Sequence, residues 1–154
     1  MNVEHATTDD IPELVELRLA YLTEDGGPLD EGVAGSIARD LPGYYRERLG
    51  KDLFVYVIRE GGAITSCAFL LARKPMSPAF PTGRTGAVLN VYTRPAWRRR
   101  GMAEALMEAM LRDAREMGLS VVELKATEDG YPLYLKVRFV DDASKYHSIW
   151  WANE

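Results

Sequence analysis

The junction between an apolar run and a helix-forming segment constrains this chain most. The apolar run Val88–Thr93 is followed by three arginines, Arg98–Arg100, and then by a helical segment, Gly101–Met117. A helix N-terminus carries unpaired backbone N–H groups and roughly half a positive elementary charge. Glycine lets a ligand come close to the backbone. We therefore expect a strand, a turn and a helix whose first turn binds a phosphate group.

The composition of the chain is that of an ordinary globular protein. The 154 residues are 47% apolar and 27% charged, which suits one domain over residues 1–154 with a core of its own. The net charge of −4 argues against a general polyanion binder, so no nucleic-acid partner is expected. The arginines of the junction are thus a local concentration of positive charge.

Several other classes of protein and site are excluded. No run of 18 apolar residues exists, so no membrane span is expected. Residues 1–10 lack the apolar centre of a signal peptide, which leaves a cytoplasmic protein as the default expectation. One cysteine, Cys67, and two histidines, His5 and His147, cannot form a zinc site. No metal is therefore expected, and Cys67 is interpreted as a small buried side chain in a strand.

Periodicity and turn signals predict alternating helices and strands. Residues 7–23 have a helical apolar face, and residues 29–50 are weakly helical, with two pieces or a kink at Pro42-Gly43. Residues 73–86 are predicted to form a loop. The predicted strands are 2–6, 53–58, 63–72, 87–93, 119–126, 137–140 and 146–151, and the later helices are 101–117 and 131–136. This pattern predicts an α+β fold with a mixed, mostly antiparallel sheet of about six or seven strands flanked by about four helices.

Two motifs resemble one family of enzymes. The P-loop and the dinucleotide-binding glycine motif are both absent. Arg98–Ala103, in contrast, matches the [QR]-x-x-G-x-[GA] motif of the GCN5-related N-acetyltransferases (GNAT). Tyr134–Phe139 resembles the late Y-x-x-x-G-F segment of that family, with Arg138 in place of the glycine. The order of predicted elements agrees along nearly the whole chain, so the resemblance implies the GNAT acyltransferase fold.

The resemblance implies acetyl-CoA as co-substrate and assigns a role to each half of the junction. Backbone groups of Val91 and Thr93 would bind the pantetheine arm. Backbone N–H groups from about residue 99 to residue 104 would bind the pyrophosphate, with the three arginine side chains adding charge-assisted bonds. The residues assigned to the cofactor are Val91, Tyr92, Thr93, Arg98, Arg99, Arg100, Gly101, Met102, Ala103 and Glu104.

Two catalytic residues follow from the same resemblance. Tyr134 corresponds to the tyrosine that protonates the leaving CoA thiolate. Glu123, a polar residue among apolar neighbours, is the candidate general base for the acceptor amine. A partly buried carboxylate there would have a raised pKa. There are two alternatives. Glu123 is an exposed strand residue without a catalytic role, or a chain of water molecules takes the place of a dedicated base.

The expected function is acetyl-CoA-dependent N-acetylation of a primary amine, on a small molecule or a peptide, by direct transfer in a ternary complex. The alternatives are a non-catalytic acyl-CoA-binding module and an O-acetyl or other acyl transferase on the same fold. The loop Glu24–Glu31 carries four carboxylates, which suits a cationic acceptor, and a solvated loop without a role in binding is the alternative. The aromatic segment Tyr146–Trp151 is expected either to form a homodimer contact or to lie in the core.

Overall fold

Five strands form one mixed sheet in sequence order, β1-β2-β3-β4-β5. The computed structural model describes residues 1–74 and 82–153. Strands β1 (Glu4–His5), β2 (Leu53–Glu60), β3 (Ala63–Arg73) and β4 (Thr85–Thr93) pair antiparallel, and β5 (Val121–Glu123) pairs parallel to β4. The α+β fold predicted from the sequence is confirmed. Of the predicted loop at 73–86, residues 75–81 lie outside the described residues, and Arg73, Thr85 and Gly86 belong to strands.

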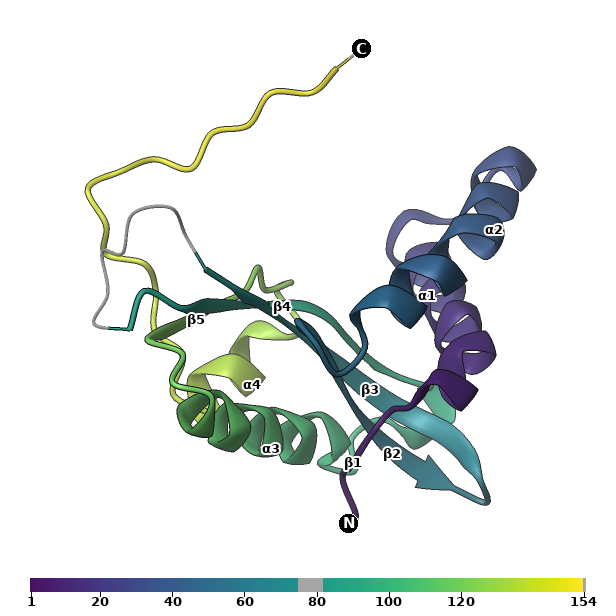
Figure 1. Cartoon of the computed structure of the whole chain (residues 1–154), viewed down its shortest axis with the longest axis horizontal. Helices are drawn as coiled ribbons and strands as arrows, with labels where there is room; N and C mark the ends of the chain where they lie inside the picture. Colours follow the sequence, from purple (N-terminus) through teal and green to yellow (C-terminus); the bar gives the residue numbers. More distant parts are fainter. Residues whose placement is uncertain (75–81, 154) are drawn as a thin grey trace.

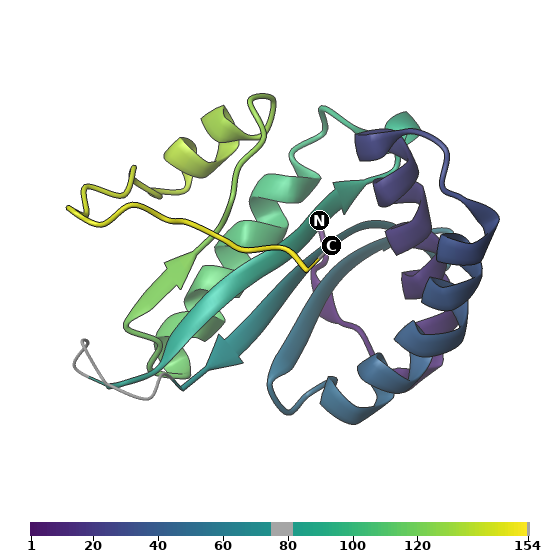
Figure 2. The same cartoon turned by 90° about the horizontal axis from the view of Figure 1, so that it is seen from above.

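Helices cover both faces of this sheet (Figures 1 and 2). Helices α1 (Ile11–Gly26) and α2 (Glu31–Arg48) lie on one face, and α3 (Met102–Glu116) and α4 (Tyr131–Lys136) lie on the other. Two short 3-10 helices, η1 (Thr8–Asp10) and η2 (Pro95–Trp97), precede α1 and α3. The central strands β2 and β3 are therefore buried on both faces, which explains their nearly continuous apolar sequence.

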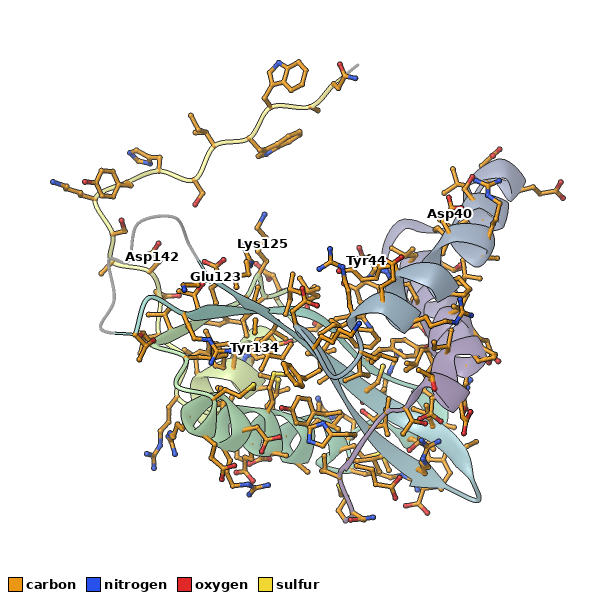
Figure 3. The ribbon with its side chains drawn as sticks, viewed as in Figure 1. Asp40, Tyr44, Glu123, Lys125, Tyr134 and Asp142 are labelled. Carbon is orange, nitrogen blue, oxygen red and sulfur yellow. The ribbon has the colours of Figure 1, made fainter. Side chains whose placement is uncertain are left out.

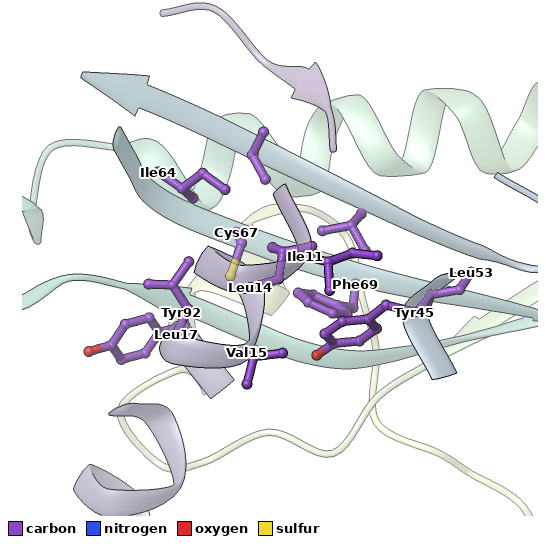
Figure 4. Close-up of a cluster of buried hydrophobic side chains, with 12 residues drawn as sticks. Ile11, Leu14, Val15, Leu17, Tyr45, Leu53, Ile64, Cys67, Phe69 and Tyr92 are labelled. Carbon is purple, nitrogen blue, oxygen red and sulfur yellow. The ribbon is translucent and has the colours of Figure 1, made fainter. Parts of the chain in front are cut away.

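Each face of the sheet has its own apolar core. Leu14 and Leu17 of α1 pack with Cys67 and Phe69 of β3 on the first face (Figure 4). On the second face, the methionines and leucine of α3 pack against Tyr56, Ala68 and Leu70 of β2 and β3. These α3 residues are Met102, Leu106, Met107 and Met110. These three methionines of α3 are thus core side chains.

Helix α2 runs without a break from Glu31 to Arg48, although Pro42 lies inside it. The alternative of two separate helical pieces is therefore wrong. A proline removes one backbone donor from a helix, while the other hydrogen bonds of the helix remain. Asp30 also caps the start of α2, because its side chain accepts a hydrogen bond of 2.8 Å from Gly32 N–H.

A β-bulge divides β4 into two halves. Phe69 of β3 pairs with Asn90, whereas the next residue, Leu70, pairs with Val88, so Leu89 is an extra residue in β4. A bulge bends its strand and increases the local twist. On its other side β4 pairs with β5 only over Thr85–Ala87, before the bulge. The edge of β4 from Val88 to Thr93 is consequently left without a neighbouring strand in the described part of the chain.

The two C-terminal strands predicted at 137–140 and 146–151 are wrong for the described residues. Val137 caps α4 and Phe139 N–H bonds to Tyr134 O, so this segment is a helix end. Residues 140–153 run away from the sheet as an extended tail (Figure 1). Ile149 and Trp150 are 90% and 85% exposed, which also excludes the core alternative. Aromatic and β-branched residues favour a strand, but a strand needs a hydrogen-bonding neighbour, and this tail has none here.

Candidate functional site

A cleft of about 960 Å³ opens where β4 and β5 separate. One wall is the second half of β4, residues 88–93, and a second is the turn that leads into α3. Tyr21, Glu24 and Asp25, near the end of α1, form the third wall. The segment from Leu124 to Lys136 forms the fourth wall and includes Tyr134. The bulge of β4 thus creates the space around which the predicted site residues gather.

Strand β4 turns two sets of backbone groups toward this cleft. Arg94 N–H donates to Thr65 O of β3 at 2.9 Å. In an antiparallel ladder the bonded pairs alternate, so the backbone groups of Val91 and Thr93 point away from β3. Arg98 Nε reaches Thr93 O at 2.9 Å, which agrees with that direction. Among the described residues no strand pairs with this edge of β4, so the N–H and C=O of Val91 are available to an extended ligand lying beside it.

The start of α3 presents unpaired N–H groups to the same cleft. Gly101, with a φ of 77°, is the N-cap, and the first bond within the helix runs from Ala105 N–H to Gly101 O. The N–H groups of the three residues between them, Met102–Glu104, have no side-chain cap. A Cβ added at Gly101 would meet nothing within 4 Å. Glycine is therefore needed at 101 for its left-handed backbone rather than for space.

The three arginines of the junction differ in their surroundings. Arg98 lines the cleft, pairs with Glu24 and lies over the Tyr92 ring at 5.6 Å. Arg99 also lines the cleft and has a left-handed φ of 63°. Arg100 lies outside the cleft lining, stacks on Trp97 at 4.7 Å and donates to Ala96 O. All the predicted cofactor residues except Arg100 thus line one cleft.

Tyr134 lies on α4 and faces the cleft (Figure 3). Its ring packs edge-on against Phe139 at 6.0 Å. Burial, with a smaller contribution from Tyr21, raises the pKa of the Tyr134 hydroxyl above its ordinary value of about 10. The hydroxyl is therefore protonated at neutral pH and is available as a donor. Arg138, which replaces the glycine of the motif, adopts a left-handed φ of 74°, so the backbone keeps a conformation that glycine favours.

Glu123 lies outside the cleft lining, and its expected partial burial is wrong. Val122 and Leu124 pack in the core beneath α3, so Glu123, between them in sequence, faces the opposite side of β5. Figure 3 shows Glu123 and Tyr134 on opposite sides of the sheet in that view. The Glu123 side chain is 67% exposed and pairs with Arg73 at 3.1 Å. Its role as general base stays a prediction, without the burial that suggested it.

Two contacts in the cleft join residues that are far apart in the sequence. Tyr92 O–H donates to Glu24 Oε1 at 2.6 Å, and Lys136 Nζ lies 2.6 Å from Glu104 Oε2. No local pattern around either residue indicates such pairs, because periodicity reports only neighbours along one element. Within residues 1–74 and 82–153, no group of three metal-ligating side chains comes together. None of the described helices is both long and apolar enough to cross a membrane.

Comparison with known proteins agrees with this geometry. A sequence model described as the Acetyltransferase (GNAT) family matches residues 14–138. The chain belongs to this family. The matched residues include the turn before α3 and the tyrosine of α4. A search of curated proteins found no match.

Solved structures of acetyltransferases share the fold. A predicted acetyltransferase with acetyl-CoA from Clostridium acetobutylicum is 25% identical and has a TM-score of 0.80, over 96% of this chain and 94% of that one. A GCN5-related N-acetyltransferase from Ralstonia eutropha JMP134 is 27% identical, with a TM-score of 0.78, over 96% and 97%. A glucosamine-6-phosphate N-acetyltransferase from Arabidopsis thaliana, 17% identical over 96% and 97%, has a TM-score of 0.71 and shows the fold alone.

Proposed function

We propose that this GNAT protein is an acetyl-CoA-dependent N-acetyltransferase that acts on a primary amine by direct transfer in a ternary complex. The observation that carries the proposal is the separation of β4 from β5. It gives one cleft three chemical features: free backbone groups on Val91, unpaired N–H groups at the start of α3, and the protonated Tyr134 hydroxyl. The similar structure from Clostridium acetobutylicum, which holds acetyl-CoA, supports the choice of co-substrate.

The residues of the cleft fit the parts of acetyl-CoA. The N–H groups of Met102, Ala103 and Glu104 would hold the pyrophosphate, helped by the positive end of the α3 dipole. Arg98 and Arg99 line the same end of the cleft and would add charge-assisted bonds. The free backbone groups of Val91 would hold the pantetheine amides, as an additional strand would. When bound, acetyl-CoA supplies a thioester whose carbonyl carbon accepts the amine.

Tyr134 and the β4 backbone would promote the transfer. The Tyr134 hydroxyl is protonated at neutral pH, so the group would donate a proton or a hydrogen bond to the departing sulfur. The free N–H of Val91 is a candidate donor to the carbonyl oxygen as negative charge develops there. The acceptor amine loses its proton to water in the open cleft, with Glu123 as the less favoured base because of its exposure and its ion pair.

Replacing Tyr134 with phenylalanine tests the catalytic part of this proposal. A panel of primary amines is assayed for thiol release from acetyl-CoA. We expect Tyr134→Phe to lower kcat by about 100-fold, within the usual range for a general acid, with little change in the Kd of acetyl-CoA. Tyr131→Phe is the matched control, because Tyr131 lies on the same helix but bonds to Asp141 instead of facing the cleft. Unchanged turnover in Tyr134→Phe would remove this hydroxyl from the mechanism.

The two alternative functions give different results in the same assay. A non-catalytic acyl-CoA-binding module would bind acetyl-CoA tightly and release no thiol with any amine or alcohol. An O-acetyltransferase would release thiol with alcohols and form products that mild alkali hydrolyses. The name of the Ralstonia eutropha structure, a GCN5-related N-acetyltransferase, favours amines as the first acceptors to test.

A further inference from the structure

Four arginines are partly buried, and one of them lacks an anionic partner among the described residues. Arg48 faces Asp52 at 2.6 Å, Arg59 faces Asp10 at 2.8 Å and Glu4 at 3.0 Å, and Arg94 faces Glu16 at 3.1 Å and Glu13 at 3.4 Å. Arg18 of α1 is the fourth, and no described carboxylate lies within 4.0 Å of its guanidinium nitrogens. A charge withdrawn from water is costly unless an opposite charge compensates it. The uncompensated Arg18 therefore needs an explanation.

Two side chains hold the guanidinium of Arg18 in one orientation. Its Nη1 donates to Asn90 Oδ1 at 3.0 Å, and its Cζ lies 5.4 Å from the centre of the Tyr21 ring. Asn90 is only 5% exposed and lies on β4 next to the free backbone of Val91. A guanidinium carries five N–H donors, and the bond to Asn90 uses one of them. Arg18 is thus oriented by its neighbours while most of its donors remain available.

These neighbours belong to the wall of the cleft. Tyr21 and Asn90 both line it, and Tyr21 also packs edge-on against Tyr92 at 6.3 Å. Arg18 therefore lies beside the cleft, next to Tyr21 of α1, whereas the N–H groups proposed to hold the pyrophosphate belong to the turn that leads into α3. An anion at Arg18 would be a different group from the pyrophosphate held by that turn.

The acidic loop at the end of α1 does not neutralise Arg18. Both oxygens of Glu24 are engaged, one by Tyr92 and the other by Arg98. Asp30 accepts from Gly32 N–H at the start of α2. Two of the four carboxylates that suggested a cationic acceptor are therefore already bonded within the protein.

From this arrangement we infer that Arg18 binds an anionic group of the acceptor, a carboxylate or a phosphate. The acceptor is then an amine that also carries an acidic group, in contrast to the cationic amine suggested by the acidic loop. A carboxylate or phosphate accepts two parallel N–H bonds from one guanidinium, which fits the free donors of Arg18. This inference rests on the proposed function for the identity of the ligand as an acceptor.

Matched pairs of amines test the inference. An amino acid is compared with its amide, and phosphoethanolamine with ethanolamine, so that each pair differs in the acidic group and one pair reports carboxylate and the other phosphate. We expect the wild-type protein to acetylate the acidic member of at least one pair more efficiently. Arg18→Met should raise the KM for that member by roughly 10- to 100-fold, as expected for a lost charge-assisted bond, with the KM of acetyl-CoA unchanged. Arg18→Lys should restore part of the affinity.

A binding measurement separates this inference from the proposed function. The thermal shift of the protein is recorded with each amine in the absence of acetyl-CoA, for wild type, Arg18→Met and the exposed control Arg46→Met. Stabilisation by the acidic members that only Arg18→Met abolishes supports the anion site even if no amine is acetylated. Equal stabilisation by both members of each pair, or none in the wild type, would overturn it. An equal loss with acidic and neutral amines in a correctly folded Arg18→Met protein would also overturn it.

Discussion

Tyr92 and Glu24 are 68 residues apart in the sequence, yet the Tyr92 hydroxyl donates to Glu24 Oε1 at 2.6 Å. This bond joins the cleft end of β4 to the end of α1. Glu24 also pairs with Arg98, a residue of the proposed phosphate-binding turn. One carboxylate therefore connects three of the elements that surround the cleft. The consequence is a pH-dependent contribution to stability.

The hydrogen bond from Tyr92 and then that from Arg98 lower the pKa of Glu24 below its ordinary value of 4.5. A lowered folded-state pKa means that Glu24 stabilises the protein above its unfolded-state pKa. That contribution is lost as the pH falls through the folded-state pKa. We expect Glu24→Gln to have a lower Tm than wild type at pH 7. Below pH 4 we expect the two Tm values to converge. Glu108→Gln, on an exposed part of α3, is the control. A lowering of Tm in Glu24→Gln that is the same at every pH would contradict the prediction.

Two substitutions at Gly101 distinguish the effect of a negative charge from the effect of backbone strain at the start of α3. Its φ of 77° strains any residue with a Cβ, by about 1 kcal/mol, so Gly101→Gln and Gly101→Glu should lose similar stability. Only the glutamate adds a negative charge where the pyrophosphate is proposed to bind. We expect Gly101→Glu to weaken acetyl-CoA binding about 10-fold more than Gly101→Gln, measured by calorimetry. Equal affinities in the two variants would place the phosphate elsewhere.

Arg138 is the second test of backbone strain. Its φ of 74° is left-handed, so Arg138→Gly should raise the free energy of unfolding by roughly 1 kcal/mol, measured by urea denaturation. Arg112→Gly is the matched control, because Arg112 is exposed in the middle of α3, where glycine costs about 1 kcal/mol. The two substitutions are expected to act in opposite directions. A loss of stability in Arg138→Gly similar to that in the control would show that the arginine side chain stabilises the turn.

The exposed tail leads to a prediction about self-association. Trp150 and Trp151 are 85% and 82% exposed, and β5 is the last strand of the described sheet. One chain thus carries both an apolar strand-forming segment and an open sheet edge that such a segment can pair with. We propose that the tail of one copy pairs with the sheet edge of a second copy and forms a dimer. Light scattering at micromolar concentrations should show a dimer, and Trp150→Ser should shift it toward monomer. A monomer at every concentration would refute this proposal.

Local signals in the sequence predict the parts of the fold that local forces determine. The turn before α3 follows from charge, Gly101 and helix periodicity together, and the short helix that carries Tyr134 is predicted at residues 131–136, after a turn. The helices α1 and α3 and the hairpin of β2 and β3 were predicted within a few residues. The bulge at Leu89 was not predicted, because it depends on how β4 pairs with β3 and carries no pattern of its own.

The other differences between the predictions and the structure depend on contacts between residues that are far apart in the sequence. The alternation of Val122, Glu123 and Leu124 indicates that Glu123 faces away from the core, but it does not indicate which face has the cleft. The environment of Arg18 depends on Asn90, 72 residues away, and nothing near Arg18 in the sequence indicates that it lacks a carboxylate partner. The tail has the composition of a strand, and only the surrounding structure shows that it has no neighbour.

The three tryptophans give the protein an optical reporter of its own. Trp97 belongs to the turn before α3 and lines the cleft, whereas Trp150 and Trp151 lie in the exposed tail. A water-soluble quencher such as iodide reaches the tail first, so the emission that survives quenching comes mainly from Trp97. Because Arg100 stacks on that indole at 4.7 Å, a rearrangement of the turn would change its emission. Ligand binding to the turn could then be followed by fluorescence without attaching a dye.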